Sequence, residues 1–286
     1  MEKLRGKALE WSTATAKQRS RVVEQLVDVY IELEKHPFTL TGSLELRSSN
    51  DTIVDSGVRN NIGRFAQPLY FSSPSEGLGP YPTLKKAYEA IITRQMQFVS
   101  TKEVGSLRVD NYLSFLWRLS VLPTLVNQST SAEGPFYLKH NDDKGDHILV
   151  DDEYNITGII DWEFASLEPT ESAFSSPCMM WPVAKFYDGD NDLSDEEKLF
   201  ATLFDERGRP DLGDAVRRGR RWQRFFFSLG ETIPADMEEF RGLFQGLRQS
   251  FAGGKDIEPY EEWKREALKA FADDQTLSDL VAASLH

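Results

Sequence analysis

Residues 136–151 read FYLKHNDDKGDHILVD, and residues 156–163 continue as ITGIIDWE. Apolar runs flank a charged middle, which is the pattern of short strands joined by a polar loop. The charged middle contains His140, Asp142, Asp143, Asp146 and His147. Imidazoles and carboxylates are the side chains that bind metal ions and transfer protons, so this density of them indicates a functional loop.

The apolar runs that follow the loop predict a β-hairpin. ILVD at 148–151 and ITGIID at 156–161 are separated by Asp152 and the turn residues EYN, so the two runs pair as its arms. His147 starts the first arm and Asp161 ends the second, which brings the two residues close together. A metal ion held by both would then face Asp142 across the loop.

The same residues resemble the catalytic segment of protein-kinase-like phosphotransferases, in which H-x-D-x-x-x-x-N precedes an Asp at a strand end. The run Ile-Ile-Asp-Trp-Glu at 159–163 narrows the resemblance to the aminoglycoside phosphotransferase and choline kinase branch. The whole segment 136–164 is most similar to the large fungal group of aminoglycoside-phosphotransferase-domain proteins. Weaker similarity extends to 18–26 and 36–44.

This resemblance implies a role for each matching residue. Asp142 matches the catalytic base, and Asp161 matches the principal metal ligand. Glu163 matches the acidic residue that supports the metal site. His140 matches the motif histidine, which braces the loop through backbone hydrogen bonds. The implied cofactors are Mg²⁺ and ATP.

His147 departs from the family pattern, because it occupies the position of the metal-ligand Asn. Imidazole can bind divalent metals, but Mg²⁺ prefers oxygen ligands. Three roles for His147 stay open: ligand to a softer metal, hydrogen-bond donor to a phosphate, or brace of the loop. His147 is therefore kept with Asp161 as a candidate for both the metal site and the cofactor site.

A kinase fold also needs an N-terminal lobe with a Gly-rich loop and a strand Lys. Neither is evident before residue 136, so the resemblance predicts a single kinase-like C-terminal lobe over 1–286. Three functions remain open. The first is transfer of the ATP γ-phosphoryl to a hydroxyl acceptor. The second is a catalytically inactive pseudokinase that binds a ligand. The third is a metal-dependent hydrolase that uses His140, Asp142, His147 and Asp161.

Outside this segment the sequence predicts mainly helices, giving an α+β fold that is mostly α. Helical periodicity and caps predict helices over 16–35, 83–100, 108–126 and much of 194–286. A hairpin is expected over 38–58, a loop over 59–82 and an irregular segment over 166–192. The basic run RRGRRWQR at 217–224 is expected to be a solvated helix face.

Charge and composition restrict the partners. The net charge of −13 disfavours a broad nucleic-acid surface and is compatible with an amino-bearing small-molecule acceptor. No apolar run reaches the ~20 residues of a membrane span, and the N-terminal residues do not read as a signal peptide. The lone Cys178 cannot form an internal disulfide, so a cytoplasmic location and a buried, unreactive thiol are expected. The oligomeric state stays open.

Overall fold

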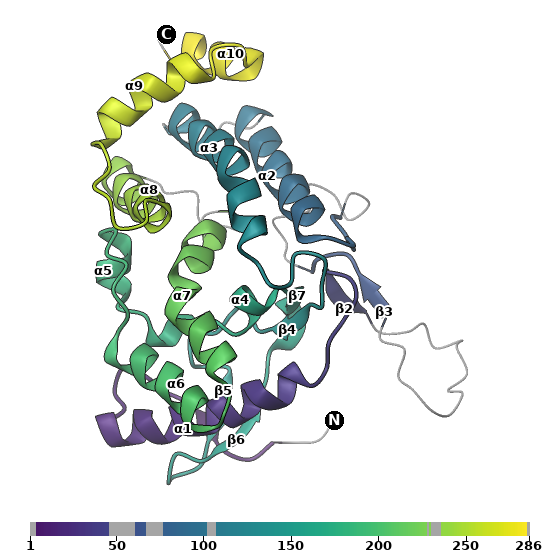
Figure 1. Ribbon diagram of the computed structural model, residues 1–286. Coiled ribbons are helices and arrows are strands. Elements are labelled where there is room, and N and C mark those ends of the chain that lie inside the picture. The colour runs from purple at the N-terminus through teal and green to yellow at the C-terminus, as the bar shows by residue number, and fades with distance from the viewer. Residues whose placement is uncertain are drawn as a thin grey trace. The chain divides into compact units, whose positions relative to one another are not determined.

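A computed structural model describes residues 4–45, 61–66, 77–101, 107–227, 229 and 236–284 (Figure 1). The hairpin predicted over 38–58 and the loop predicted over 59–82 lie partly outside these residues. Within them, Ser43–Glu45 (β2) pairs antiparallel with Asn61–Gly63 (β3), with Leu44 opposite Ile62. The observed partner of β2 therefore lies beyond the predicted hairpin.

Helices dominate the described part of the chain, and the sheets in it are small and antiparallel. The helices are α1 Ala16–Glu34, α2 Leu84–Thr101, α3 Arg108–Asn127, α4 Thr170–Ala173, α5 Val183–Tyr187, α6 Asp195–Glu206, α7 Pro210–Phe227, α8 Met237–Phe251, α9 Tyr260–Ala270 and α10 Gln275–Ala283. The other strands are β1 Lys7–Ala8, β4 Tyr137–Lys139, β5 Ile148–Val150, β6 Ile156–Ile159 and β7 Ser166–Glu168. The predicted α+β class with mostly helical content is confirmed. None of the described helices combines the length and the apolar character needed to cross a bilayer.

The chain separates into two compact units, which are described one at a time. The first unit comprises residues 1–87, 129–181 and 194–219, and the second comprises residues 88–128, 182–193 and 220–286. Every candidate residue from the sequence motif belongs to the first unit.

Two small sheets of the first unit frame the motif. Strands β5 and β6 form the predicted hairpin, with Ile148 opposite Ile159, and β1 pairs with the other edge of β5. Strand β4 pairs with β7, with Leu138 opposite Leu167. The pairings of β1 and β7 were not predicted, because strands of two or three residues are too short to show a period. The segment 166–192, which was expected to be irregular, thus begins with strand β7.

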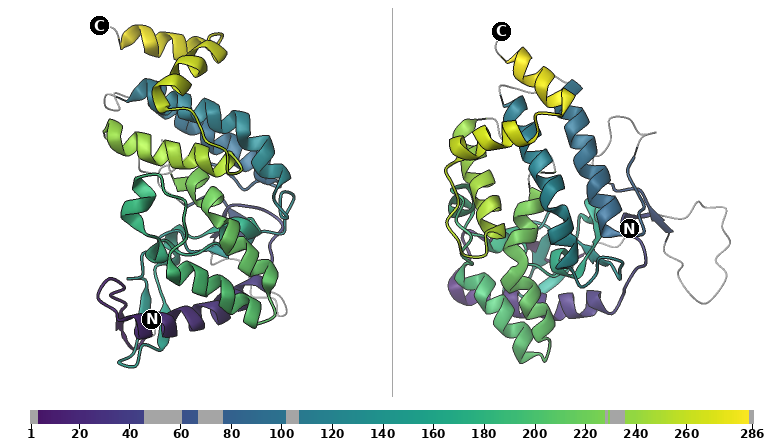
Figure 2. Two further views of the ribbon diagram at one scale, coloured as in Figure 1. Left: turned by 60° about the vertical axis from the view of Figure 1, so that its left-hand side comes forward. Right: turned by 45° about the horizontal axis from the view of Figure 1, so that its top comes forward.

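Helix α1 supplies the apolar face against which the motif packs. Thr15 caps it, and Gln18 completes a capping box with the Thr15 backbone N–H. Val22, Val23 and Leu26 are buried along one side. Helix α1 runs beside α6 (Figure 2) and joins a core cluster that includes Ile148, Phe174, Phe200 and Phe204. Burying these side chains stabilises each by about 1.5–3 kcal/mol relative to solvent exposure.

Helix α7 corrects the expectation for the basic run. Arg217 and Arg218 are exposed as predicted, but Arg220 and Arg224 are buried. The Arg224 guanidinium donates to the carbonyl oxygens of Phe186 and Asp190 at 2.7 Å each. A helix face with period 3.6 can therefore bury every fourth arginine when backbone carbonyls lie opposite it.

The Asp190 carbonyl belongs to residues 188–192, DGDND, which we call the aspartate loop.

Candidate functional site

We call residues 140–147 the histidine loop, and it is tied by both of its ends to the peptide before Asp161. His140 Nε2 lies 2.8 Å from the carbonyl oxygen of Ile160, so it donates a hydrogen bond there. The Ile160 N–H in turn donates to the carbonyl oxygen of His147 at 2.9 Å. The peptide groups on both sides of Ile160 are thereby fixed relative to the loop.

Asp161 follows this clamp in an unusual backbone conformation. Its φ of 62° and ψ of 41° lie in the left-handed region, which residues with a Cβ seldom adopt. Such strain persists where the surroundings enforce it, and it concentrates at functional sites. The Asp161 side chain is exposed, and so is that of Glu163 in the short 3₁₀ helix Trp162–Phe164. Both carboxylates are therefore free of the core.

Asp142 also presents its carboxylate to solvent. Its side chain is 47% exposed and pairs with Lys144, which is 64% exposed, at 2.9 Å. The hydrogen bond to Asp142 raises the pKa of Lys144 above its ordinary value. Exposed ion pairs contribute only ~0–1 kcal/mol. The pair can thus open and leave the Asp142 carboxylate available to another partner.

His147 lies in a different environment from Asp161, although the hairpin brings their backbones together. The imidazole is buried, and its Nδ1 accepts a hydrogen bond from the Gly145 N–H at 3.3 Å. Gly145 has a φ of 112°, which suits glycine alone. Burial, with a contribution from His140, lowers the pKa of His147 to about 4. His147 is therefore neutral near pH 7, with its proton on Nε2.

Asp143 belongs to the same charged loop, but its carboxylate is buried. Its side chain is only 7% exposed. One carboxylate oxygen accepts from the Cys178 N–H at 2.8 Å, and the other pairs with Lys139 at 3.3 Å. This contact could not be predicted from the local pattern, because Cys178 lies 35 residues further along the chain. Asp146 of the same loop is exposed.

Cys178 fits the expectation of an unreactive thiol. Burial is the main cause that raises the pKa of this thiol above its ordinary value, and the nearby Asp143 carboxylate adds to the effect. A thiol that resists ionisation is a poor nucleophile.

Asn141 is a site residue that the sequence reasoning missed. Its amide donates to the carbonyl oxygen of Phe164 at 2.7 Å and to the hydroxyl of Ser166 at 2.9 Å. These bonds attach the residue beside Asp142 to the segment that follows Asp161 and Glu163. Its position between His140 and Asp142 was the one feature of the sequence that could have identified Asn141 as a site residue.

The donor set at this site suits magnesium better than a softer metal. Among the residues with described positions, no group of three or more His, Cys, Asp or Glu side chains could hold a metal ion. Mg²⁺ uses one or two carboxylates and completes its shell with water and phosphate oxygens. Asp161 and Glu163 fit that requirement as exposed oxygen donors. The hydrolase alternative, with His140, Asp142, His147 and Asp161 as ligands, gains no support.

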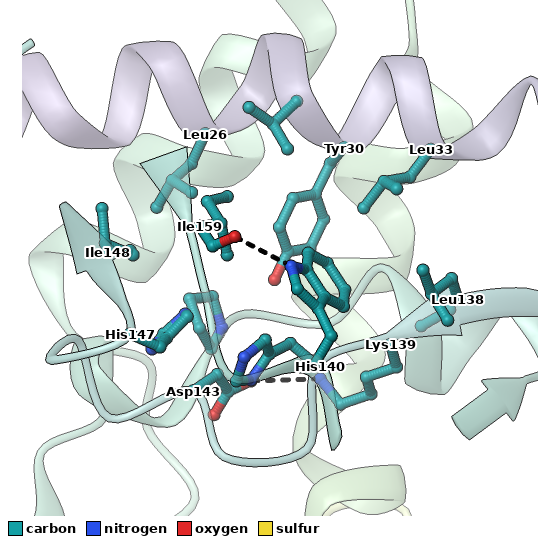
Figure 3. Close-up of a pocket in the computed structure, with 14 residues that line it drawn as sticks. Leu26, Tyr30, Leu33, Leu138, Lys139, His140, Asp143, His147, Ile148 and Ile159 are labelled. Carbon is teal, nitrogen blue, oxygen red and sulfur yellow. Dashed lines mark hydrogen bonds and ion pairs between the residues drawn. The ribbon is translucent and has the colours of Figure 1, made fainter. Parts of the chain in front are cut away.

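A pocket lies on the inner side of the histidine loop, between the loop and helix α1 (Figure 3). Figure 3 shows Leu26, Tyr30 and Leu33 of α1 facing His140 and His147. The His140 and His147 rings lie 4.1 Å apart between centroids, tilted by 30°. Asp142 and Asp161 do not line this pocket. The inner face of the histidine loop thus holds the two imidazoles and the Lys139–Asp143 ion pair, whereas the Asp142 carboxylate lies outside the pocket.

Comparison with models of known protein families finds none that matches the chain. Comparison with curated proteins finds a partial match. The chain is 30% identical over 138 residues to clavilactone A biosynthesis cluster protein Y from Ampulloclitocybe clavipes. That match covers 42% of this chain and 33% of the relative, so the chain spans about a third of the length of this curated protein.

Proposed function

We propose that the chain acts as a small-molecule phosphotransferase of the aminoglycoside phosphotransferase and choline kinase type. The observation that carries the proposal is Asp161, exposed and held in a left-handed conformation directly after the peptide clamped by His140 and His147. A carboxylate fixed in this way is preorganised to receive a cation without further ordering. The sequence resemblance assigns the same residue to the metal.

Within this proposal each residue has a defined task. Asp161 and Glu163 would hold Mg²⁺, and bound Mg·ATP would supply the phosphoryl group with its charge neutralised. The Asp142 carboxylate would leave Lys144, orient the acceptor hydroxyl and take its proton. Asn141 and His140 would act as positioning residues, because they tie the loop to the segments on both sides of Asp161. The net charge of −13 is compatible with an amino-bearing acceptor.

The test is ATP turnover with Mg²⁺ on a panel of amino alcohols and aminoglycosides. We expect Asp142→Asn to lower turnover by about 100-fold or more, since a general base contributes ~10²–10⁴. Asp146→Asn is the matched control, because it removes an exposed carboxylate from the same loop, and it should leave turnover unchanged. Absence of nucleotide binding at millimolar ATP, or equal effects of the two variants, would contradict the proposal.

The burial of His147 favours a second candidate, an inactive kinase-like protein that binds a ligand. His147 occupies the position of the second metal ligand, yet its ring is buried and Nδ1 is already bonded to Gly145. His147→Asn, which restores the family residue, separates the two functions. Appearance of turnover only in that variant would show that the native chain is the binding protein.

A further inference from the structure

We propose that Ser166 and Glu168 of strand β7 are positioning residues that hold Asp142 in place through the side chain of Asn141. The inference rests on the proposed function for the role of Asp142 as the base, but the contacts that carry it involve no nucleotide. All of these residues belong to the first unit. Strand β4, which leads into the histidine loop, pairs with β7, and Lys139 lies opposite Ser166 in that pairing. The histidine loop therefore begins directly beside Ser166.

Three side chains form a continuous series of hydrogen bonds, which we call the serine relay: Glu168, Ser166 and Asn141. The Ser166 hydroxyl has one proton, which it donates to the Glu168 carboxylate at 2.6 Å. The Ser166 oxygen can then only accept, and it accepts from the Asn141 amide nitrogen at 2.9 Å. The same nitrogen donates to the carbonyl oxygen of Phe164 at 2.7 Å. Both bonds of the amide nitrogen thus go to the segment that follows Asp161.

The serine relay also determines which way the Asn141 amide is turned. In the opposite orientation, the Oδ1 oxygen would meet the Phe164 carbonyl oxygen and the Ser166 oxygen, whose proton is already bound by Glu168. Acceptors that face each other without a shared proton stay unsatisfied, which is unfavourable away from water. The amide nitrogen therefore faces β7, and Oδ1 is left without a partner among the described residues.

The inner end of the serine relay is buried and fixed by further hydrogen bonds. Ser166 is fully buried, and Glu168 is 2% exposed. The strand that carries them is tied to another segment, because the Leu167 N–H donates to the Gly42 carbonyl oxygen at 2.7 Å and the Leu167 carbonyl oxygen accepts from the Thr41 hydroxyl at 2.6 Å. Hydrogen bonds in series within a low-dielectric interior strengthen one another. The relay thus connects a fixed interior strand to the accessible part of the histidine loop.

Loss of the relay should reduce turnover and leave substrate binding nearly unchanged. A general base acts only when its carboxylate lies within hydrogen-bond reach of the proton that it takes, and small displacements of a reacting group are costly. Ser166 and Glu168 are too deeply buried to touch a substrate. They can influence Asp142 only by holding Asn141, the residue before it. A change confined to placement of the base lowers kcat while KM for ATP and for the acceptor stays nearly constant.

The test removes the Ser166 hydroxyl and follows both turnover and NMR signals. We expect Ser166→Ala to lower kcat by about 10-fold with little change in KM, since a positioning hydrogen bond is lost. In the ¹⁵N-labelled chain without nucleotide, the Asn141 side-chain amide and the Asp142 backbone amide should both shift. Ser175→Ala is the matched control, because it removes a similarly buried hydroxyl that donates to the Ser172 carbonyl oxygen. It should leave kcat and both signals unchanged, and equal effects of the two variants would overturn the proposal.

A second pair of variants separates the hydroxyl from the volume of the side chain. Ser166→Thr and Ser166→Val add the same shape to a buried position, but only Thr keeps the hydroxyl. We expect kcat to be about 10-fold higher in Ser166→Thr than in Ser166→Val, and equal values would contradict the role of the hydroxyl. If Ser166→Ala fails to fold, Ser166→Cys takes its place, because a thiol keeps the volume and weakens both hydrogen bonds. It should move the same two amide signals, and unmoved signals would overturn the inference.

A double-mutant cycle tests whether Ser166 acts through Asn141. Once Asn141→Leu has broken the relay, adding Ser166→Ala should not lower kcat further, and independent effects of the two changes would refute the proposal. A native chain without ATP turnover, whose amide signals still respond to Ser166→Ala, would refute only the phosphotransferase proposal. An active chain whose kcat and amide signals ignore Ser166→Ala would refute only this one.

Discussion

The histidine loop and the aspartate loop are both short and rich in aspartate, yet they are fixed by opposite kinds of hydrogen bond. In the histidine loop, the Asp143 carboxylate accepts from the Cys178 N–H, and its partner cation is Lys139. In the aspartate loop, the Asp190 carbonyl accepts from the buried Arg224 and the Asp192 carbonyl from the buried Arg220, and the Asp188 side chain faces solvent. Similar composition therefore says little about which atoms of a loop carry its stability.

The difference has a functional consequence for each loop. The histidine loop buries one carboxylate and two imidazoles, which leaves Asp142 accessible on a braced backbone. The aspartate loop uses its main chain to satisfy a buried cation, and so its exposed carboxylates form no preorganised site. A cluster of acidic residues becomes a candidate site only when the structure also fixes the backbone that presents them.

The largest effect is expected when the Arg224 guanidinium, which the Asp190 carbonyl of the aspartate loop accepts from, is removed. Arg224→Leu strands the buried carbonyls of Phe186 and Asp190 and removes a guanidinium that lies 3.9 Å from the Phe186 ring centroid. We expect the free energy of unfolding to fall by about 3–5 kcal/mol. Urea denaturation measures this loss, and Arg218→Leu on the exposed side of α7 is the control. Equal, small effects of both variants would show that the carbonyls find other donors.

Acid should affect the histidine loop selectively. The pKa of His147 is lowered from 6.5 to about 4 in the folded chain, so between these values the unfolded state binds a proton that the folded state does not. Stability should therefore be complete above about pH 6.5 and decline towards pH 4, by an amount on the order of 3 kcal/mol. His147→Asn should flatten this part of the stability profile. A slope that persists in the variant would assign the titration to another group.

The smallest expected effects compare the buried carboxylate of Asp143 with the exposed carboxylate of Asp188. Asp143→Asn removes the charge that faces Lys139 but keeps an oxygen for the Cys178 N–H, so we expect a loss of about 1–2 kcal/mol. Asp188→Asn alters an exposed side chain and should change stability by less than about 0.5 kcal/mol. The two midpoints of urea denaturation, measured in parallel, give the comparison directly. A reversal of this order would mean that the exposed carboxylates of the aspartate loop carry stability after all.

Much of the secondary structure could be predicted from the sequence because its signals are local. The period of Val22 and Leu26 and the capping box at Thr15 define α1 within a few turns of chain. The turn residues between ILVD and ITGIID define the β5–β6 hairpin in the same way. The types of residue around Asp142 and Asp161 were also enough to single out the candidate site.

What the sequence could not determine depends on partners that are distant along the chain. The burial of Asp143 depends on Cys178, the burial of Arg224 depends on carbonyls near residue 190, and the pocket depends on α1 facing the histidine loop. A charged side chain becomes buried only when specific donors or acceptors replace its water, and the position of those groups is a property of the tertiary structure. Sequence alone thus named the residues of the site, and the tertiary structure decided which of their atoms are exposed, which are bonded and which are left without a partner.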